Sequence, residues 1–81
     1  MNMTQQLESA FVEVLGIDPG SDFDKLAYGC TQGWDSTAHM ALVAEIEAKF
    51  DIMLSTDDLI AMSTFDKAKE IVRKYGIVFN S

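Results

Sequence analysis

Apolar residues recur at helical spacing in three stretches of the chain. In the first, residues 4–15, they follow the i, i+4, i+8, i+11, i+12 spacing of one helix face. Thr4 is a suitable N-cap for this helix and Gly16 a suitable stop. The apolar positions are Met3, Leu7, Phe11, Val14 and Leu15.

The clearest helical pattern runs from Ser36 to Phe50. Asp35 stands where an N-cap is expected, which places Ser36 at the first helical position, exposed at the helix end. The opposite face carries Glu45, Glu47 and Lys49. The apolar stripe consists of Leu42, Val43, Ile46 and Phe50, with Ala38 or His39 one turn earlier.

Two more helices are predicted after residue 50. A short one covers residues 57–62, with Thr56 or Ser55 as its cap. The last begins at residues 63–66, a variant of the capping box, and ends at Gly76. The pattern therefore predicts an all-α bundle of three main helices and one short helix. The tail, residues 77–81, is too short to assign. The last helix has an apolar stripe of Phe65, Ala68, Ile71, Val72 and Tyr75.

A long connection, residues 16–34, separates the first two helices and is rich in turn-forming residues. Loops of this length in compact proteins are more often functional than incidental. A short helical turn is expected around residues 24–27, and Trp34 is expected to fasten the loop rather than line an entry to a site. The expected anchors are Phe23, Leu26, Tyr28 and Trp34.

The length of 81 residues indicates one domain, residues 1–81, with one core. The formal net charge of −7 argues against nucleic acid and anionic membrane surfaces as partners. It favours partners with basic docking surfaces, although solubility alone also accounts for it. Cys30 is the only cysteine, and we expect it to be partly buried and inert. Without a recognisable signal peptide or membrane span, the chain is expected to be cytoplasmic.

Ser36, His39 and Asp35 are the residue types of a serine hydrolase triad: a serine, a base and an acid. Side chains on consecutive turns of a surface helix diverge, however, so we predict no catalytic residues. No metal site is expected either, because the single His and the single Cys lack partners at ligand spacing. Asp57 and Asp58 suit the first turn of their helix.

Ser36 has two further interpretations that the residues alone leave open. It can be part of a helix cap, the simpler reading. It can instead be an attachment site, because an exposed hydroxyl at a helix N-terminus would place a phosphodiester beside unpaired N–H groups.

The chain as a whole resembles the acyl carrier proteins, over residues 4–75. The resemblance rests on Asp35-Ser36 at the start of the second helix, where that family has Asp-Ser-Leu, and on the following LVAEIEAKFDI. It implies that Ser36 carries 4′-phosphopantetheine, transferred from coenzyme A by a separate Mg²⁺-dependent transferase, with Asp35 positioning the serine. The carrier itself would catalyse nothing.

The resemblance also implies that the second helix faces acyl-loading and acyl-accepting enzymes with basic docking surfaces, and a monomer is the default expectation. The family normally has Leu where this chain has Thr37, and often an acid where it has Ala41. In its residues Trp34, His39 and Met40, this chain looks more like the specialised stand-alone carriers of polysaccharide or secondary-metabolite pathways. The corresponding docking positions are Thr37, Met40, Ala41, Ala44, Glu45, Glu47, Asp57 and Asp58.

An alternative is a small acidic helical interaction module without a prosthetic group, in which Ser36 only caps. His39 could touch the phosphate or the arm, but we expect it to be a half-buried helix residue near the loop.

Overall fold

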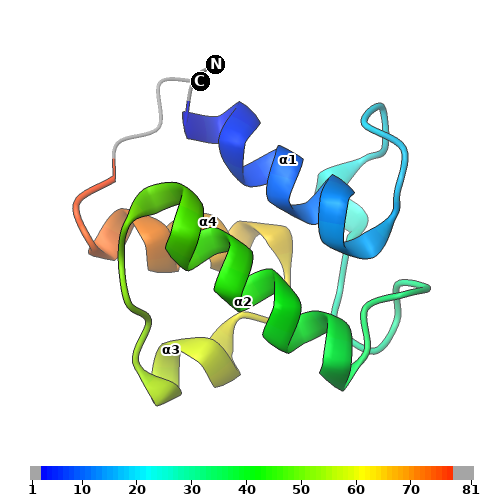
Figure 1. Ribbon diagram of the computed structural model, residues 1–81. Helices are drawn as coiled ribbons and strands as arrows, with labels where there is room; N and C mark the ends of the chain where they lie inside the picture. The colour runs from blue at the N-terminus through cyan, green and yellow to red at the C-terminus, as the bar shows by residue number, and fades with distance from the viewer. Residues whose placement is uncertain (1–2, 78–81) are drawn as a thin grey trace.

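The structure is a computed structural model that describes residues 3–77. Over this range it is all-helical, and the only β-type pairing is an isolated bridge between Ala27 and Thr64. The predicted all-α architecture of three main helices and one short helix is confirmed (Figure 1). The tail residues 78–81 lie outside the described range. The elements are α1 (Met3–Leu15), a 3₁₀ turn η1 (Phe23–Lys25), α2 (Ser36–Phe50), α3 (Thr56–Ala61) and α4 (Phe65–Lys74).

Helix α1 begins at Met3, one residue before the expected start. Thr4 therefore lies inside the helix, and the prediction that Thr4 is the N-cap is wrong. The C-terminus agrees with the sequence: the N–H of Gly16 donates to the carbonyl of Val12 at 2.9 Å, with φ at 68°. A left-handed residue of this kind is a common helix stop that glycine adopts without steric cost.

Helix α2 has the predicted start at Ser36. The Asp35 carboxylate accepts the backbone N–H of Ala38 at 2.9 Å, which satisfies one of the unpaired donors of the first turn. The helix ends at Phe50, and the C-cap residue Asp51 has a left-handed φ of 54°. Aspartate tolerates this conformation better than most residues, so the chain turns there without glycine.

The caps of α3 and α4 settle two expectations. Ser55, not Thr56, caps α3, which therefore covers Thr56–Ala61, one residue earlier than predicted. Thr64 caps α4 by accepting a backbone N–H three residues further on, at 3.1 Å. The expected capping box beginning at Ser63 is therefore wrong by one residue.

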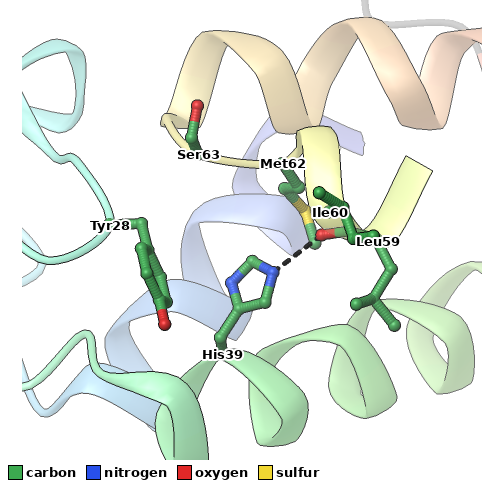
Figure 2. A pocket seen from close by; sticks show the side chains of 6 residues that line it. All are labelled: Tyr28, His39, Leu59, Ile60, Met62 and Ser63. Atoms are coloured by element: carbon green, nitrogen blue, oxygen red, sulfur yellow. Dashed lines mark hydrogen bonds between the residues drawn. The ribbon is translucent and has the colours of Figure 1, made fainter. Parts of the chain in front are cut away.

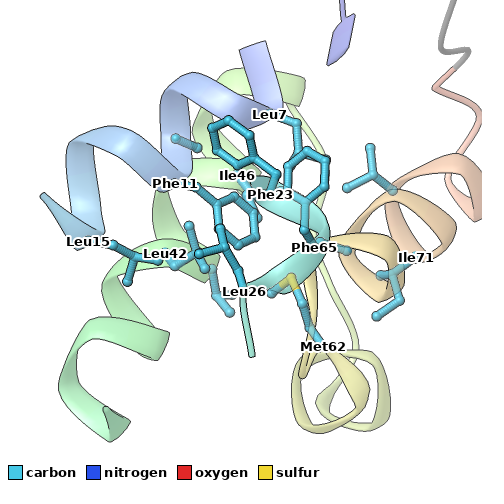
Figure 3. Packing of buried hydrophobic residues seen from close by; sticks show 14 of the residues in the cluster. Leu7, Phe11, Leu15, Phe23, Leu26, Leu42, Ile46, Met62, Phe65 and Ile71 are labelled. Atoms are coloured by element: carbon cyan, nitrogen blue, oxygen red, sulfur yellow. The ribbon is translucent and has the colours of Figure 1, made fainter. Parts of the chain in front are cut away.

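The core lies where the apolar faces of the helices meet. Helices α1 and α2 lie side by side and run in opposite directions, with α4 behind them (Figure 1). Phe11 connects these parts, because its ring makes edge contacts with Trp34 at 5.3 Å and with Phe65 at 5.1 Å. Figure 3 shows Phe11 and Phe65 in the core. The largest fully buried side chains are Trp34, Phe11, Leu7, Leu42, Ile46, Met62 and Val72.

The long first connection is fastened to this core, largely as predicted. Phe23 and Leu26 are buried, and Trp34 is only 1% exposed. The helical turn covers Phe23–Lys25, one residue earlier than expected. Tyr28 is 41% exposed beside the start of α2, but its ring lies against the buried rings of His39 and Trp34, so it also anchors the loop, from the surface side.

Candidate functional site

Ser36 stands exposed at the first position of α2, with its hydroxyl free of the capping role. Asp35 performs that role, because its carboxylate accepts the N–H of Ala38. The first turn of α2 contains no acidic side chain. Its unpaired N–H groups and the positive end of the helix dipole favour a negative group at this place.

The hydroxyl of Ser36 is hydrogen-bonded to the hydroxyl of Tyr28 at 2.9 Å. These residues are eight positions apart, and the loop between them folds back on itself. The Thr31 hydroxyl accepts the N–H of Ala27 at 2.9 Å, and the N–H of Gly29 donates to the Trp34 carbonyl at 3.1 Å. The end of the long connection is therefore a closed loop that presents Tyr28 to Ser36.

His39 lies behind this loop and links three segments. Its Nδ1 accepts the indole N–H of Trp34 at 3.0 Å, and its Nε2 is 2.8 Å from the carbonyl oxygen of Leu59 in α3. An indole N–H only donates, so Nδ1 is unprotonated and Nε2 carries the proton. With 8% exposure His39 is buried more deeply than the half-buried position expected. Both ring nitrogens are engaged away from Ser36, which leaves no serine–histidine pair.

An open cavity of about 230 Å³ adjoins these residues, between the loop, α2 and α3 (Figure 2). Tyr28 belongs both to this cavity and to the contact with Ser36. Ile60, on the α3 side, is 71% exposed. The cavity is lined by Tyr28, His39, Leu59, Ile60, Met62 and Ser63.

The predicted docking positions on α2 fall into two groups. Glu45 and Glu47 are half-buried and engaged within the protein: Glu45 pairs with Lys49 at 3.6 Å, and Glu47 accepts the N–H of Leu54 at 2.8 Å. The remaining positions on α2 are exposed, and with Asp57 on α3 they form the accessible part of the predicted face. These exposed positions are Thr37, Met40, Ala41, Ala44 and Asp57.

Asp58 corrects one expectation, because it is only 7% exposed and does not belong to an accessible docking face. Its carboxylate accepts hydrogen bonds from the Lys74 ammonium and, at 2.6 Å, from the Tyr75 hydroxyl. The hydrogen bond from Lys74, and to a lesser degree that from Tyr75, lowers the pKa of Asp58. The bond between Asp58 and Lys74 also raises the pKa of Lys74. Asp58 is a structural group that fastens α3 to the end of α4.

Three further observations concern other kinds of site. Cys30 is exposed, so the expectation of a partly buried thiol is wrong. Among residues 3–77, no three His, Cys, Asp or Glu side chains gather closely enough to hold a metal ion. No helix in the same range is long and apolar enough to cross a membrane.

Sequence reasoning missed the contact between Tyr28 and Ser36. Nothing in the spacing of the two residues signals it, because it depends on the closed loop between them. Sequence reasoning also treated Asp58 as equivalent to Asp57, and only the position of α4 distinguishes them.

The sequence of this chain was compared with those of known proteins. The acyl carrier protein of Karelsulcia muelleri (strain GWSS) is 30% identical over 70 residues, which cover 86% of this chain and 84% of that protein. This chain belongs to the acyl carrier protein family. No family model matches the chain, and no solved structure matches it.

Membership in the acyl carrier protein family confirms two predictions from the sequence: the family itself, and that the chain is a carrier rather than an enzyme. The geometry is consistent with this. The serine that the resemblance singled out is exposed, and the histidine nearest to it along the helix is occupied by other contacts.

Proposed function

We propose that this acyl carrier protein carries acyl or related carboxylic intermediates on a 4′-phosphopantetheine arm attached to the hydroxyl oxygen of Ser36. The terminal thiol of such an arm supplies the thioester that holds the cargo. The observation that carries the proposal is that Asp35, and not Ser36, caps α2. Asp35 caps the helix, so the exposed Ser36 hydroxyl can be modified without removing the cap.

The residues around Ser36 fit a phosphodiester. The N-terminal turn of α2 offers unpaired N–H groups and the positive end of a 15-residue helix, and no acidic side chain stands within that turn. Asp35 directs its carboxylate to the N–H of Ala38, and Tyr28 brings a neutral hydroxyl to Ser36. A hydroxyl can donate to a phosphate oxygen, whereas a carboxylate would repel it.

We further propose that partner enzymes dock on the exposed positions of α2 and on Asp57. The partners are a phosphopantetheinyl transferase and enzymes that load and accept the cargo, with basic surfaces that complement the charge of −7. The local acidic footprint is small, because Glu45 is paired with Lys49, Glu47 is hydrogen-bonded to the N–H of Leu54, and Asp58 is buried. Apolar and small side chains on α2, Met40 and Ala44 among them, therefore provide much of this surface.

The cargo and setting remain part of the proposal. Thr37 after the serine, and Trp34 before Asp35, favour a specialised polysaccharide or secondary-metabolite pathway over general fatty-acid synthesis. We propose a cytoplasmic carrier in which residues 1–81 act as one domain. The cavity beside Tyr28 offers the cargo an apolar surface close to Ser36.

Intact-mass measurement tests the attachment. The purified chain, incubated with coenzyme A, Mg²⁺ and a broad-specificity phosphopantetheinyl transferase, is expected to gain about 340 Da by covalent addition of the arm. Ser36→Ala is expected to stay unmodified. Ser63→Ala removes another exposed serine hydroxyl, which lines the cavity beside Tyr28, and is expected to be modified like the wild type. A folded wild type that gains no mass would overturn the proposal and favour the interaction module without a prosthetic group.

A further inference from the structure

The hydroxyl of Tyr28 lies 2.9 Å from the hydroxyl oxygen of Ser36, and this contact is built into the fold. The backbone N–H of Tyr28 donates to the carbonyl of Ser63 at 2.8 Å, in the connection between α3 and α4. The neighbouring residue Ala27 forms the isolated bridge with Thr64. The backbone of Tyr28 is thus fixed by a segment far from Ser36 in the sequence.

The ring of Tyr28 is held as well. It makes an edge contact with the His39 ring at 5.1 Å (Figure 2). It makes a longer edge contact with the Trp34 ring at 6.4 Å. His39 and Trp34 are themselves buried and hydrogen-bonded to each other. The ring and the backbone of Tyr28 are therefore both supported by contacts that do not involve Ser36.

We propose that Tyr28 is a positioning residue for Ser36, which orients the serine hydroxyl for modification and then donates a hydrogen bond to the phosphodiester formed there. The inference rests on the proposed function. Tyr28 remains 41% exposed and Ser36 is exposed, so the contact leaves the serine oxygen accessible to an incoming group.

The chemistry of the transfer determines what Tyr28 does at each stage. The Ser36 oxygen forms a bond to the phosphorus on the pantetheine side of coenzyme A, and the bond to the second phosphate breaks. Adenosine 3′,5′-bisphosphate leaves with the electron pair, and the serine proton passes to a base of the transferase. Before this step either hydroxyl of the pair can donate. After it the serine oxygen has no proton, so Tyr28 is the donor.

The test compares the initial rate of modification of the full-length wild type, Tyr28→Phe and Tyr75→Phe by one transferase with coenzyme A and Mg²⁺. Tyr28→Phe removes one oxygen and keeps the ring. Its kcat is expected to fall between about 2-fold and about 10-fold, the range that one hydrogen bond of ordinary net strength covers. Its KM for the carrier is expected to stay within about 2-fold, because the docking positions on α2 are unchanged.

Tyr75→Phe is the matched control, since Tyr75 is the only other tyrosine. Its hydroxyl contacts Asp58 and the N–H of Ser55, away from Ser36. This variant is expected to have a lower thermal midpoint and an unchanged rate of modification. A rate that falls in both variants would assign the effect to stability and overturn the positioning role.

A second measurement does not depend on the rate. The phosphorus-31 resonance of the modified protein is expected to shift in Tyr28→Phe relative to wild type and to stay unchanged in Tyr75→Phe. Equal rates and equal phosphorus spectra for Tyr28→Phe and wild type would overturn the inference while the carrier function stands. A wild type that is never modified would overturn both.

Discussion

The indole N–H of Trp34 donates to Nδ1 of His39 at 3.0 Å, with the two rings inclined by only 20°. Because the indole can only donate, this contact selects the form of the neutral imidazole that carries its proton on Nε2. That proton then reaches the carbonyl of Leu59 at 2.8 Å. One buried histidine thus connects the loop before Ser36 to α3.

Trp34→Phe tests this link, because it keeps an aromatic ring but removes the donor. Nδ1 of His39 is then a buried acceptor without a partner. We expect this lost hydrogen bond to lower the free energy of unfolding by about 1–3 kcal/mol. Urea denaturation measures it. In a His39→Leu background the acceptor is already gone, so the same change should cost less. Equal losses in both backgrounds would contradict the coupling.

Ser36→Ala and Leu42→Ala separate an exposed modification site from the core. Ser36 is exposed and does not cap α2, so its replacement is expected to change the free energy of unfolding by well under ~1 kcal/mol. Leu42 is fully buried between the helices, and its truncation is expected to cost ~2–5 kcal/mol, enough to unfold much of so small a protein. Urea titration of both variants checks this, and similar losses would make Ser36 structural.

The fold was largely predictable from the sequence because its signals are local. The apolar stripe of α2, the cap at Asp35 and the glycine stop at Gly16 each depend on residues within a turn or two. The errors are also local: Thr4 lies inside α1, and Thr64 rather than Ser63 caps α4. Single-residue choices between adjacent Ser and Thr depend on how the next helix packs, which the local pattern does not contain.

The candidate site was predictable only in part. Asp35 and Ser36 carry a local signature, and the exposure of Ser36 follows from its place at a helix start. The partner of Ser36 does not, because Tyr28 reaches it through a folded loop. Asp58 illustrates the same limit: its burial depends on Lys74, 16 residues away.

Gly33 and Gly29 offer a matched pair for the closed loop before Ser36. Both have positive φ, 92° and 78°, so alanine is strained at either position. Only at Gly33 would the added carbon also meet another atom, the carbonyl oxygen of Leu15 at 3.1 Å. Gly33→Ala is therefore expected to lower the free energy of unfolding more than Gly29→Ala, whose cost should be about 1–2 kcal/mol. Urea denaturation compares the two variants. Equal costs would show that the backbone shifts enough to relieve the contact between the added carbon at residue 33 and the carbonyl oxygen of Leu15.

The contacts of Asp58 predict how the stability of the protein varies with pH. Its pKa is lowered from the ordinary value of 3.8, so its contribution is present above that value and is lost as the pH falls through the folded-state pKa. The pKa of Lys74 is raised from 10.5, so its contribution is present below that value and is lost as the pH rises through the folded-state pKa. One ion pair should therefore steepen the loss of stability at both ends of the pH range.

Asp58→Asn is expected to lower the thermal midpoint near neutral pH and to flatten its dependence on pH in both the acidic and the alkaline range. Asp57→Asn is the control, because it removes the neighbouring exposed carboxylate from the same first turn of α3 and keeps both contacts of Asp58. Thermal unfolding followed by circular dichroism at a series of pH values checks both variants. If the two profiles coincide, α3 is not fastened through Asp58, and the carboxylate would count only toward the charge of the surface. If only Asp58→Asn flattens the profile, the contacts of Asp58 with Lys74 and Tyr75 account for this part of the pH dependence.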